Sequence, residues 1–232
     1  MAVSGGVDSA VLLFLALKYA KNVNACFVKT EFQPEFELDD AERVCRDLNV
    51  KPVVLEISVL KNLNVYSNPM NRCYYCKKEI FSAIVDFASK KDSVVTEGTN
   101  ASDDVDNRPG YKAIKEFGVF SPLRICGYNK SKIRQIAREN NICVCEKPSY
   151  ACLATRIPAG TIITPELLVK TEAAEKELFT LGYNDFRIRC NGAGALLELT
   201  KADRQRYLEN KSYVDNILKT YYNEITLGEK VR

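Results

Sequence analysis

The cysteines Cys73 and Cys76 lie three residues apart in the segment NRCYYCKK, within a chain of 232 residues that contains no histidine. This spacing is common among the ligands of zinc and of iron–sulfur clusters, and the basic side chains around it favour the thiolate that binds metal. A helix that begins with two unrelated cysteines is the simpler alternative. If the segment binds metal, it supplies only two ligands, and the others must come from elsewhere in the chain.

The chain has nine cysteines, an odd number spread along its length. We therefore expect reduced thiols in a cytoplasmic protein rather than a framework of disulfides. Most of these thiols should be small buried side chains. This interpretation applies to Cys26, Cys45, Cys126 and Cys190.

Three further cysteines leave alternatives open. Cys143 and Cys145 form a C-x-C pair that either reaches a metal or occupies one face of a strand. Cys152 stands at the expected junction of two domains, where ligand sites are frequent. Together with Cys73 and Cys76 it would give three thiolates, which leave a four-coordinate zinc site incomplete but can hold three irons of a cubane cluster.

The absence of histidine limits the chemistry available to the site. It removes the commonest general base and the commonest zinc ligand, and it excludes Ser-His and Cys-His catalytic pairs. Carboxylates, lysines, thiolates or the substrate itself must then move protons.

The hexapeptide SGGVDS at 4–9 is the strongest indication of a nucleotide site. Its two glycines let the backbone approach a ligand at the start of a long apolar helix, whose first amides face an anion. Ser4 and Ser9 add hydroxyl groups, and Asp8 would hold Mg²⁺ between itself and the phosphates. A capped glycine turn without a ligand is the alternative. The complete pattern favours phosphate binding, although it is neither a Walker loop nor a dinucleotide motif.

Length and composition are those of a globular protein with two domains of unequal size. Apolar residues make up 46% of the chain and the formal net charge is +3, which argues against bulk nucleic-acid binding but allows a local anion site. No segment has the length of an apolar membrane span, and the N-terminus lacks the features of a signal peptide. We therefore expect a cytoplasmic protein without nucleic-acid or membrane partners.

Strands and helices alternate along residues 1–150. Buried strands are expected at 24–30, 51–57, 93–99 and 118–125, and helices at 10–20, 34–50, 76–91 and 131–141. This order predicts an α/β domain with a doubly wound, mainly parallel sheet. The first strand would consist only of MAV, which is too short for a central strand. We expect either residues missing upstream of Met1 or an unusual start.

Residues 151–232 follow a different order and predict a smaller α+β domain. A helix is expected at 164–181, with Thr164 as N-cap and Pro165 at the first helical position. Strands follow in the segments FRIRC and GALLELT, then a helix at 201–219 and a last strand near EITLGEKV.

Arg187 and Arg189 stand two residues apart in the first of these strands. Side chains at this spacing project from one face of a strand, an arrangement that suits a nucleotide phosphate. Two solvated arginines on an edge strand are the alternative, and spacing by itself favours it.

The segment SGGVDS resembles the PP-loop of ATP pyrophosphatases, which cleave ATP between its α and β phosphates. The segment EGTNASDD at 97–104 follows a predicted strand and resembles the second motif of that family. Thr30 lies at a strand end where the family holds the adenine. The resemblance implies ATP as ligand, with AMP and pyrophosphate as products. The residues it assigns to ATP are Ser4, Gly5, Gly6, Val7, Asp8, Ser9, Thr30, Gly98, Thr99 and Arg108.

Along nearly its whole length the chain resembles the LarE family of ATP-dependent sulfur transferases. The matching segments are SGGVDS, DDVDNRPGYKA, KPSYACLATRIPAGTIIT, AAEKELFTLGY and FRIRC. Members of this family replace carboxylate oxygen by sulfur on a pyridinium biscarboxylic acid mononucleotide, the precursor of the nickel-pincer cofactor of lactate racemase. The resemblance implies a homo-oligomer in which the domain at 151–232 binds the substrate.

Two branches of the LarE family differ in their source of sulfur. In one, a cysteine in the segment like SYACLATR gives up its own sulfur and becomes dehydroalanine, so each protein acts once. In the other, three cysteines carry a 4Fe–4S cluster whose open iron binds a sulfide and passes it on. Because Cys73 and Cys76 are present, the resemblance implies the second branch, with Cys152 as third ligand and inorganic sulfide or a sulfide donor as partner.

The resemblance also assigns roles in the reaction. A substrate carboxylate attacks the α phosphorus of ATP bound with Mg²⁺, pyrophosphate leaves, and sulfide then displaces AMP. Cys152 and Asp8 are catalytic in this scheme. Glu175 is an acid–base or metal residue, with an exposed helical carboxylate as the alternative. The side chains expected to bind the substrate phosphate are Arg156, Arg187 and Arg189.

Two other functions remain open on the residues alone. Some PP-loop thiolases that modify tRNA also use three cysteines and a cluster, although the cysteine-rich and RNA-binding modules usual in them are not visible here. The non-catalytic alternative is a nucleotide-binding module with zinc held by Cys73, Cys76, Cys143 and Cys145.

Overall fold

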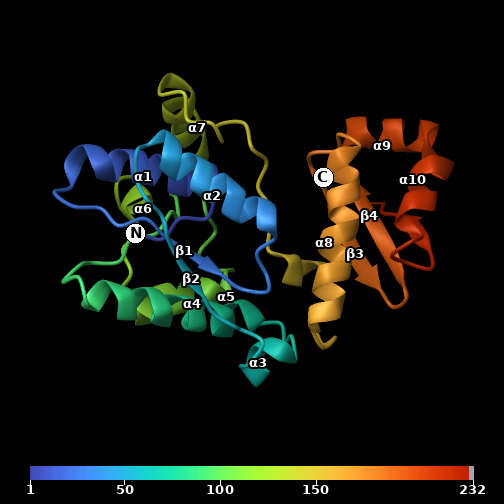
Figure 1. Ribbon diagram of the computed structural model, residues 1–232, viewed down its shortest axis with the longest axis horizontal. Coiled ribbons are helices and arrows are strands. Elements are labelled where there is room, and N and C mark those ends of the chain that lie inside the picture. Colours follow the sequence, from blue (N-terminus) through green and yellow to red (C-terminus); the bar gives the residue numbers. More distant parts are fainter. Residues whose placement is uncertain (230–232) are drawn as a thin grey trace. The chain divides into compact units, whose positions relative to one another are not determined.

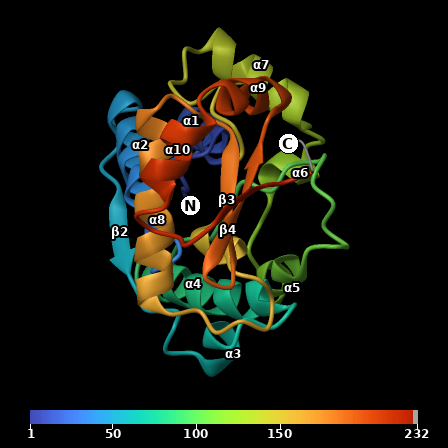
Figure 2. The same ribbon diagram turned by 90° about the vertical axis from the view of Figure 1, so that its right-hand side faces the viewer.

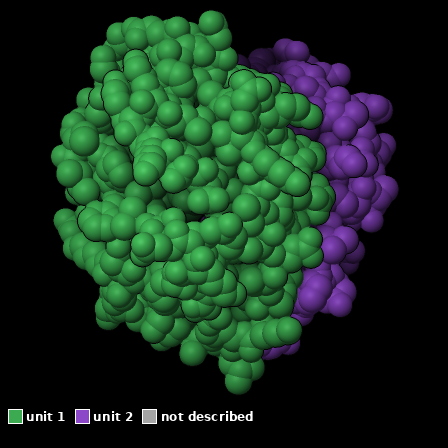
Figure 3. Space-filling view, turned by 60° about the vertical axis from the view of Figure 1, so that its left-hand side comes forward, with its two compact units in different colours: residues 1–65, 69–150 green, residues 66–68, 151–232 purple. Residues whose placement is uncertain are grey.

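The computed structural model describes residues 1–229. The chain divides into two compact units, one of residues 1–65 and 69–150 and the other of residues 66–68 and 151–232 (Figure 3). Each unit has its own strands and helices and is described by itself. None of the helices in residues 1–229 combines the length and the apolar character needed to cross a membrane.

The first unit is built on parallel pairing. β1 (Cys26–Lys29) pairs with β2 (Val53–Glu56) in parallel. Ala2 forms a parallel bridge with the first residue of β1, and its amide donates to the carbonyl of Thr96 over 2.8 Å. Thr96 in turn forms a parallel bridge with Phe120.

Five extended segments therefore lie side by side in the order β2, β1, the segment of Ala2, the segment of Thr96 and the segment of Phe120. Numbered by their position in the chain, this order is 3-2-1-4-5. This is a doubly wound order, which confirms the predicted α/β fold class. The MAV segment lies in the middle despite its shortness. The strands predicted at 93–99 and 118–125 are reduced to the single bridge between Thr96 and Phe120. The first ends early because the side chain of Glu97 accepts a hydrogen bond from the amide of Thr99. The second ends early because Pro122 starts a helix.

Helices cover both faces of these segments (Figure 1). The reason is the alternation of β1, in which Phe27 packs into one core while Cys26 and Val28 pack into another. The first core is closed by α1 (Val7–Tyr19), α2 (Glu35–Asp47) and α7 (Lys130–Glu139), and the second by α4 (Arg72–Ser89) and α5 (Pro109–Glu116). Burial on both faces explains why β1 reads as an apolar run. The sequence patterns did not predict α5 or the one-turn helices α3 (Leu63–Tyr66) and α6 (Pro122–Ile125).

The second unit contains a mixed sheet in the order β3-β4-β5. β3 (Phe186–Asn191) runs antiparallel to β4 (Gly194–Leu199), and β5 (Ile225–Leu227) runs parallel to β4. α8 (Pro165–Thr180) packs against this sheet (Figure 2). Its predicted N-terminus is confirmed, since the hydroxyl of Thr164 accepts a hydrogen bond from the amide of Leu167.

The helix predicted at 201–219 is two helices, α9 (Lys201–Glu209) and α10 (Lys211–Leu218). The backbone of Asn210 leaves the helical region, with φ −120° and ψ 20°, and its side-chain amide donates to the carbonyl of Arg206. This local bond competes with the helix and ends it. The last predicted strand shortens to β5, and its expected residues Lys230 and Val231 lie outside the described residues.

The cysteines are buried, half-buried or exposed. Cys26, Cys45 and Cys190 are buried as predicted, whereas Cys126 is exposed, because it ends the short helix α6 at a surface turn. Cys143 and Cys145 lie in turns rather than on a strand, and Cys143 is exposed. The backbone reverses here, since Asn141 has φ 52° and the amide of Cys145 donates to the carbonyl of Ile142, the residue after Asn141.

This division predicts the order in which the thiols react. Burial raises the pKa of Cys26 to about 11 and also raises the pKa of Cys45. Partial burial and a hydrogen bond with Asp47 raise the pKa of Cys143. At about pH 8 the native chain should therefore be alkylated first at Cys126, then at Cys143, with Cys26 and Cys45 reacting only after denaturation. Timed iodoacetamide labelling with peptide mass spectrometry measures the order, and early labelling of Cys26 would contradict the packing of β1.

Candidate active site

Residues 4–9 form a tight loop that follows the first extended segment and continues into the first turn of α1, which begins at Val7. Gly5 has φ +70°, and a Cβ atom built on it would lie 2.6 Å from the carbonyl oxygen of Glu37. The amide of Ser4 donates to Ser9 Oγ over 3.1 Å, and Ser9 Oγ donates to the carbonyl of Gly6 over 3.0 Å. These bonds close the loop on itself at the N-terminus of α1, where helix amides favour an anion.

Lys147 supports this loop from behind. Its Nζ donates to the carbonyl of Gly5 over 3.2 Å and forms ion pairs with Glu37 and Asp40 at 3.0 and 2.6 Å. The lysine side chain is 16% exposed. It therefore joins the loop at 4–9, which we call the phosphate loop after its predicted role, to the first turns of α2, with Lys147 lying 142 positions from Gly5.

The segment EGTNASDD lies against the same loop. Oε2 of Glu97 accepts from the amide and the hydroxyl of Thr99, at 3.0 and 2.8 Å, and Oε1 accepts from the hydroxyl of Ser121. A Cβ atom on Gly98 would lie 3.0 Å from the amide nitrogen of Ser9. Only glycine allows this close approach of the two motifs.

Asp8 forms an ion pair with Lys130, which was not predicted from the sequence. Lys130 Nζ lies 2.6 Å from Asp8 Oδ2, and Asn100 Nδ2 donates to Asp8 Oδ1 over 3.3 Å. Lys130 begins α7, whose N-cap Asn129 accepts from the amide of Lys132. A basic residue at a helix start just beyond a strand was the available signal, because that position lies at the carboxyl edge of a parallel sheet.

A cavity of about 800 Å³ opens above these residues, within the size range of nucleotide sites. Its lining includes Ser4, Asp8, Ser9, Gly98, Thr99, Arg108 and Lys130. One face of α4 forms the opposite wall, with residues at helical spacing: Cys73, Lys77, Ile80, Phe81 and Ile84. The cavity therefore has a polar region at the phosphate loop and an apolar wall along α4.

Cys73 lines this cavity, and Cys76 stands one turn further along α4 and is 8% exposed. Nη2 of Arg72 lies 3.6 Å from Cys73 Sγ. Two thiols one turn apart on one helix suit the donor chemistry of a cluster or zinc ion. Residues 1–229 contain no group of three or more Cys, Asp or Glu side chains gathered as metal ligands, so the complete ligand set stays a prediction.

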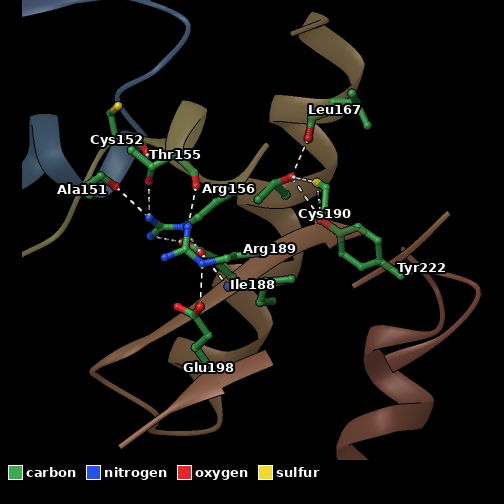
Figure 4. A network of polar contacts seen from close by, with 12 residues as sticks. Ala151, Cys152, Thr155, Arg156, Leu167, Ile188, Arg189, Cys190, Glu198 and Tyr222 are labelled. Atoms are coloured by element: carbon green, nitrogen blue, oxygen red, sulfur yellow. Dashed lines mark hydrogen bonds and ion pairs between the residues drawn. The ribbon is translucent and has the colours of Figure 1, made fainter. Parts of the chain in front are cut away.

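In the second unit, Cys152 precedes the 3₁₀ turn η1 (Leu153–Arg156). Its carbonyl accepts from the amide and the hydroxyl of Thr155 at 2.9 and 2.8 Å (Figure 4). Nη1 of Arg156 donates to the carbonyl of Ala151 over 3.1 Å and to Thr155 Oγ1 over 2.9 Å. The segment around Cys152 is thus held by the guanidinium group of Arg156.

Arg156 and Glu175 form a buried two-point ion pair. Nε and Nη2 of Arg156 lie 2.6 and 3.2 Å from the two carboxylate oxygens of Glu175, and the amide of Ile188 donates to the same carboxylate over 3.2 Å. Each residue is only 1% exposed. The alternative of an exposed carboxylate at Glu175 is therefore wrong, because this residue lies on the face of α8 that packs against β3.

Arg187 and Arg189 lie on one face of the edge strand β3, between buried residues. Arg189 Nε lies 2.7 Å from Glu198 Oε1, and its Nη1 donates to the carbonyl of Thr155 over 2.9 Å (Figure 4). Arg189, whose side chain is 32% exposed, is thus tied to the turn that follows Cys152. The assignment of Arg156, Arg187 and Arg189 to a substrate phosphate stays a prediction.

Comparison with known proteins gives relatives over most of the chain. The family described as queuosine biosynthesis protein QueC matches residues 1–79. The pyridinium-3,5-bisthiocarboxylic acid mononucleotide synthase of Lactiplantibacillus plantarum is 31% identical over 205 residues, which cover 87% of this chain and 74% of that protein. An uncharacterised protein of Synechocystis sp. is 33% identical over 96% of this chain and 84% of its own length.

Solved structures share the fold at low identity. The NMN synthetase of Francisella tularensis has a TM-score of 0.51 at 19% identity, over 64% of each chain. The glutamine-dependent NAD⁺ synthetase of Acinetobacter baumannii has a TM-score of 0.52 at 21% identity, over 64% of this chain and 32% of that one.

The doubly wound strand order and the glycine loop at 4–9 define a protein of the PP-loop class. Within that class, the chain belongs to the LarE family, which includes the synthase of Lactiplantibacillus plantarum.

Proposed function

We propose that this protein uses ATP to activate a carboxylate of pyridinium-3,5-biscarboxylic acid mononucleotide and replaces its oxygen by sulfur. Membership of the LarE family supports the substrate class, since the relative from Lactiplantibacillus plantarum is named for the bisthiocarboxylic product. One observation carries the proposal for this chain: Cys73 lines the same cavity as the phosphate loop. A sulfur ligand and a nucleotide site in one cavity suit sulfur transfer to an activated acid.

The activation step uses the residues of the phosphate loop. The loop amides and Lys130 bind the triphosphate, and Asp8 would hold Mg²⁺ together with the phosphate oxygens. A substrate carboxylate oxygen attacks the α phosphorus, and the bond to the β phosphate breaks to release pyrophosphate. The acyl adenylate that forms is a far better electrophile than a free carboxylate.

The transfer step then replaces the adenylate. Hydrosulfide attacks the carbonyl carbon, and the bond from this carbon to the adenylate oxygen breaks. AMP leaves with the electron pair of that bond, and the proton of the hydrosulfide passes to water. The product is a thiocarboxylate. Lys77 lines the cavity beside Cys73 and supplies positive charge toward the departing anions.

We propose Cys73, Cys76 and Cys152 as ligands of a 4Fe–4S cluster. Their thiolates are the usual donors for such a cluster, and three of them leave one iron open. When bound, the cluster would supply an exogenous sulfide. Cys73 would then hold the cluster beside the nucleotide. In the sacrificial alternative, the transferred sulfur is that of Cys152 itself. The homo-oligomer expected from the family is part of the same proposal.

The test is an anaerobic reaction of the reconstituted protein with ATP, Mg²⁺, sulfide and the biscarboxylic mononucleotide. We expect AMP, pyrophosphate and a product whose mass reflects the exchange of oxygen for sulfur, with several turnovers per chain. Activity on tRNA with none on the mononucleotide would overturn the proposal. Loss of hydrogen sulfide from Cys152 in the intact protein, with one turnover only, would favour the sacrificial route.

Cysteine variants separate the ligands from the bystanders. Cys73→Ala, Cys76→Ala and Cys152→Ala should each lose the iron and acid-labile sulfide of the reconstituted protein. The exposed Cys126→Ala is the matched control and should retain both. Zinc without iron in the native chain, lost in Cys143→Ala, would instead support a structural zinc site.

A further inference from the structure

The ammonium group of Lys147 uses all three of its N–H donors within the protein. They reach the carbonyl oxygen of Gly5 at 3.2 Å, Glu37 Oε1 at 3.0 Å and Asp40 Oδ2 at 2.6 Å. A lysine ammonium has three donors, so this set is complete. The two carboxylates would by themselves make an ordinary ion pair. The third bond, to the main chain of the phosphate loop, asks for a separate explanation.

The main chain of Lys147 is fixed independently of the phosphate loop. Arg134 of α7 donates through Nη2 to the carbonyl of Lys147 over 3.0 Å and through Nη1 to the carbonyl of Cys145. The amide of Lys147 donates to the carbonyl of Val144 over 3.1 Å. Lys147 is therefore held by α7 at its backbone, and its ammonium group is held by α2 and the loop.

The bond from Lys147 determines the orientation of one peptide group in the loop. The carbonyl of Gly5 and the N–H of Gly6 belong to the same peptide, and none of the described peptide bonds is cis. In a planar trans peptide these two groups point in opposite directions. Because the carbonyl of Gly5 faces Lys147, the N–H of Gly6 faces away from Lys147 and from the carboxylates of α2.

The space beside Gly6 is open. Gly5 is buried, whereas Gly6 is half-buried. Apart from the chain neighbours of Gly6, a Cβ atom built on it would meet only Ser4 Oγ among the described atoms, at 3.5 Å, and Ser4 lines the cavity. Across residues 1–229, no main-chain carbonyl accepts a hydrogen bond from the amide of Gly6. This N–H is thus available to an anion bound at the loop.

We propose that Lys147 is a positioning residue for the phosphates of ATP, because it holds the carbonyl of Gly5 toward α2 and so keeps the N–H of Gly6 directed at a phosphate oxygen. This inference rests on the proposed use of ATP. A peptide between two glycines turns easily, since neither residue has a Cβ atom to restrict it. If this peptide turned over, its carbonyl oxygen would face the phosphates and repel them.

The test uses Lys147→Met, which keeps a long side chain and removes all three donors. We expect the dissociation constant of magnesium tripolyphosphate, measured by calorimetry, to rise by about tenfold or more, the usual effect of losing a hydrogen bond to a charged group. Adenosine has no phosphates, and its binding, measured by NMR titration, should not change. Equal weakening of both ligands, or of neither, would overturn the proposal.

A double variant separates orientation from charge. Lys147→Met leaves Glu37 without this lysine, and Lys147→Met/Glu37→Leu removes that carboxylate, while Asp40 keeps its ion pair with Arg43 at 2.7 Å. The double variant should recover melting temperature but not tripolyphosphate affinity, and it provides a folded protein if the single variant does not fold. Recovery of tripolyphosphate affinity would show that Lys147 acts only by neutralising charge, which contradicts the proposal.

Lys211→Met is the matched control. It also removes a lysine from a carboxylate, that of Asp215, whose side chain is 9% exposed, but it does so in the second unit. Its melting temperature should fall, and its dissociation constant for tripolyphosphate should equal that of the wild type. If Lys211→Met weakens tripolyphosphate as much as Lys147→Met does, a general loss of stability explains both, and the proposal fails.

The failure of this inference is distinguishable from that of the proposed function. If the wild type binds neither MgATP nor magnesium tripolyphosphate, the proposed function fails. If the wild type binds both and Lys147→Met binds them equally well, only the role of Lys147 fails.

Discussion

Replacing Gly5 with alanine is expected to lower MgATP-dependent pyrophosphate release by about 100-fold, because small displacements of a phosphate loop misalign the reacting groups. The added Cβ would lie 2.6 Å from the carbonyl oxygen of Glu37 and 3.0 Å from the Cβ of Asp40. Both belong to α2, which Lys147 holds in place. We therefore expect the loop to move, because the nearest atom belongs to the backbone of a helix. Steady-state kinetics and calorimetric MgATP titration measure the effect.

Gly118→Ala is the matched control for Gly5→Ala. Gly118 has φ +63°, close to the +70° of Gly5, but a Cβ atom there would meet none of the described atoms within 4 Å. Both variants share the backbone strain, about 1–2 kcal/mol, and only Gly5→Ala adds the collision. If the two variants lose stability equally and both bind MgATP normally, the packing of α2 on the loop is not what requires glycine.

Replacing Arg156 with methionine is expected to lower the free energy of unfolding of the second unit by roughly 3–5 kcal/mol. The substitution leaves the carboxylate of Glu175 buried without its guanidinium partner, and it releases the turn that carries Cys152. Urea unfolding followed by circular dichroism measures the loss. The double variant Arg156→Met/Glu175→Leu should recover much of it, because no charge is then left buried.

The pair Arg138–Glu146 is the matched control. Its two contacts, 2.6 and 3.3 Å, resemble the 2.6 and 3.2 Å of the buried pair, but its side chains are 56% and 66% exposed. Arg138→Met should leave the unfolding midpoint nearly unchanged, because water solvates a carboxylate left unpaired at the surface. If Arg156→Met proves equally mild while substrate affinity falls sharply, Arg156 serves the substrate phosphate rather than the fold.

Local patterns sufficed for much of the fold. Alternation in β1 and helical spacing in α8 are properties of neighbouring residues, and the hexapeptide at 4–9 carries its own glycines and hydroxyls. The break at Asn210 and the exposure of Cys126 were missed. At Asn210 a hydrogen bond from the side chain to the carbonyl of Arg206 outweighs the helical pattern. At Cys126 the turn that ends α6 outweighs the apolar pattern.

The sequence by itself determined the fold class, the glycine loop at 4–9 and the C-x-x-C spacing of Cys73 and Cys76, because each depends on residues within a few positions of one another. The structure placed both cysteines on one helix, since α4 begins at Arg72, four residues before the helix predicted at 76–91. Only the tertiary structure decided the partners of these groups. Lys130 lies 122 positions from Asp8, Lys147 lies 142 from Gly5, and the pairing of Arg156 with Glu175 depends on how α8 packs against β3. No local spacing encodes such contacts, since they arise when strands of distant origin align and bring their ends to one edge of a sheet.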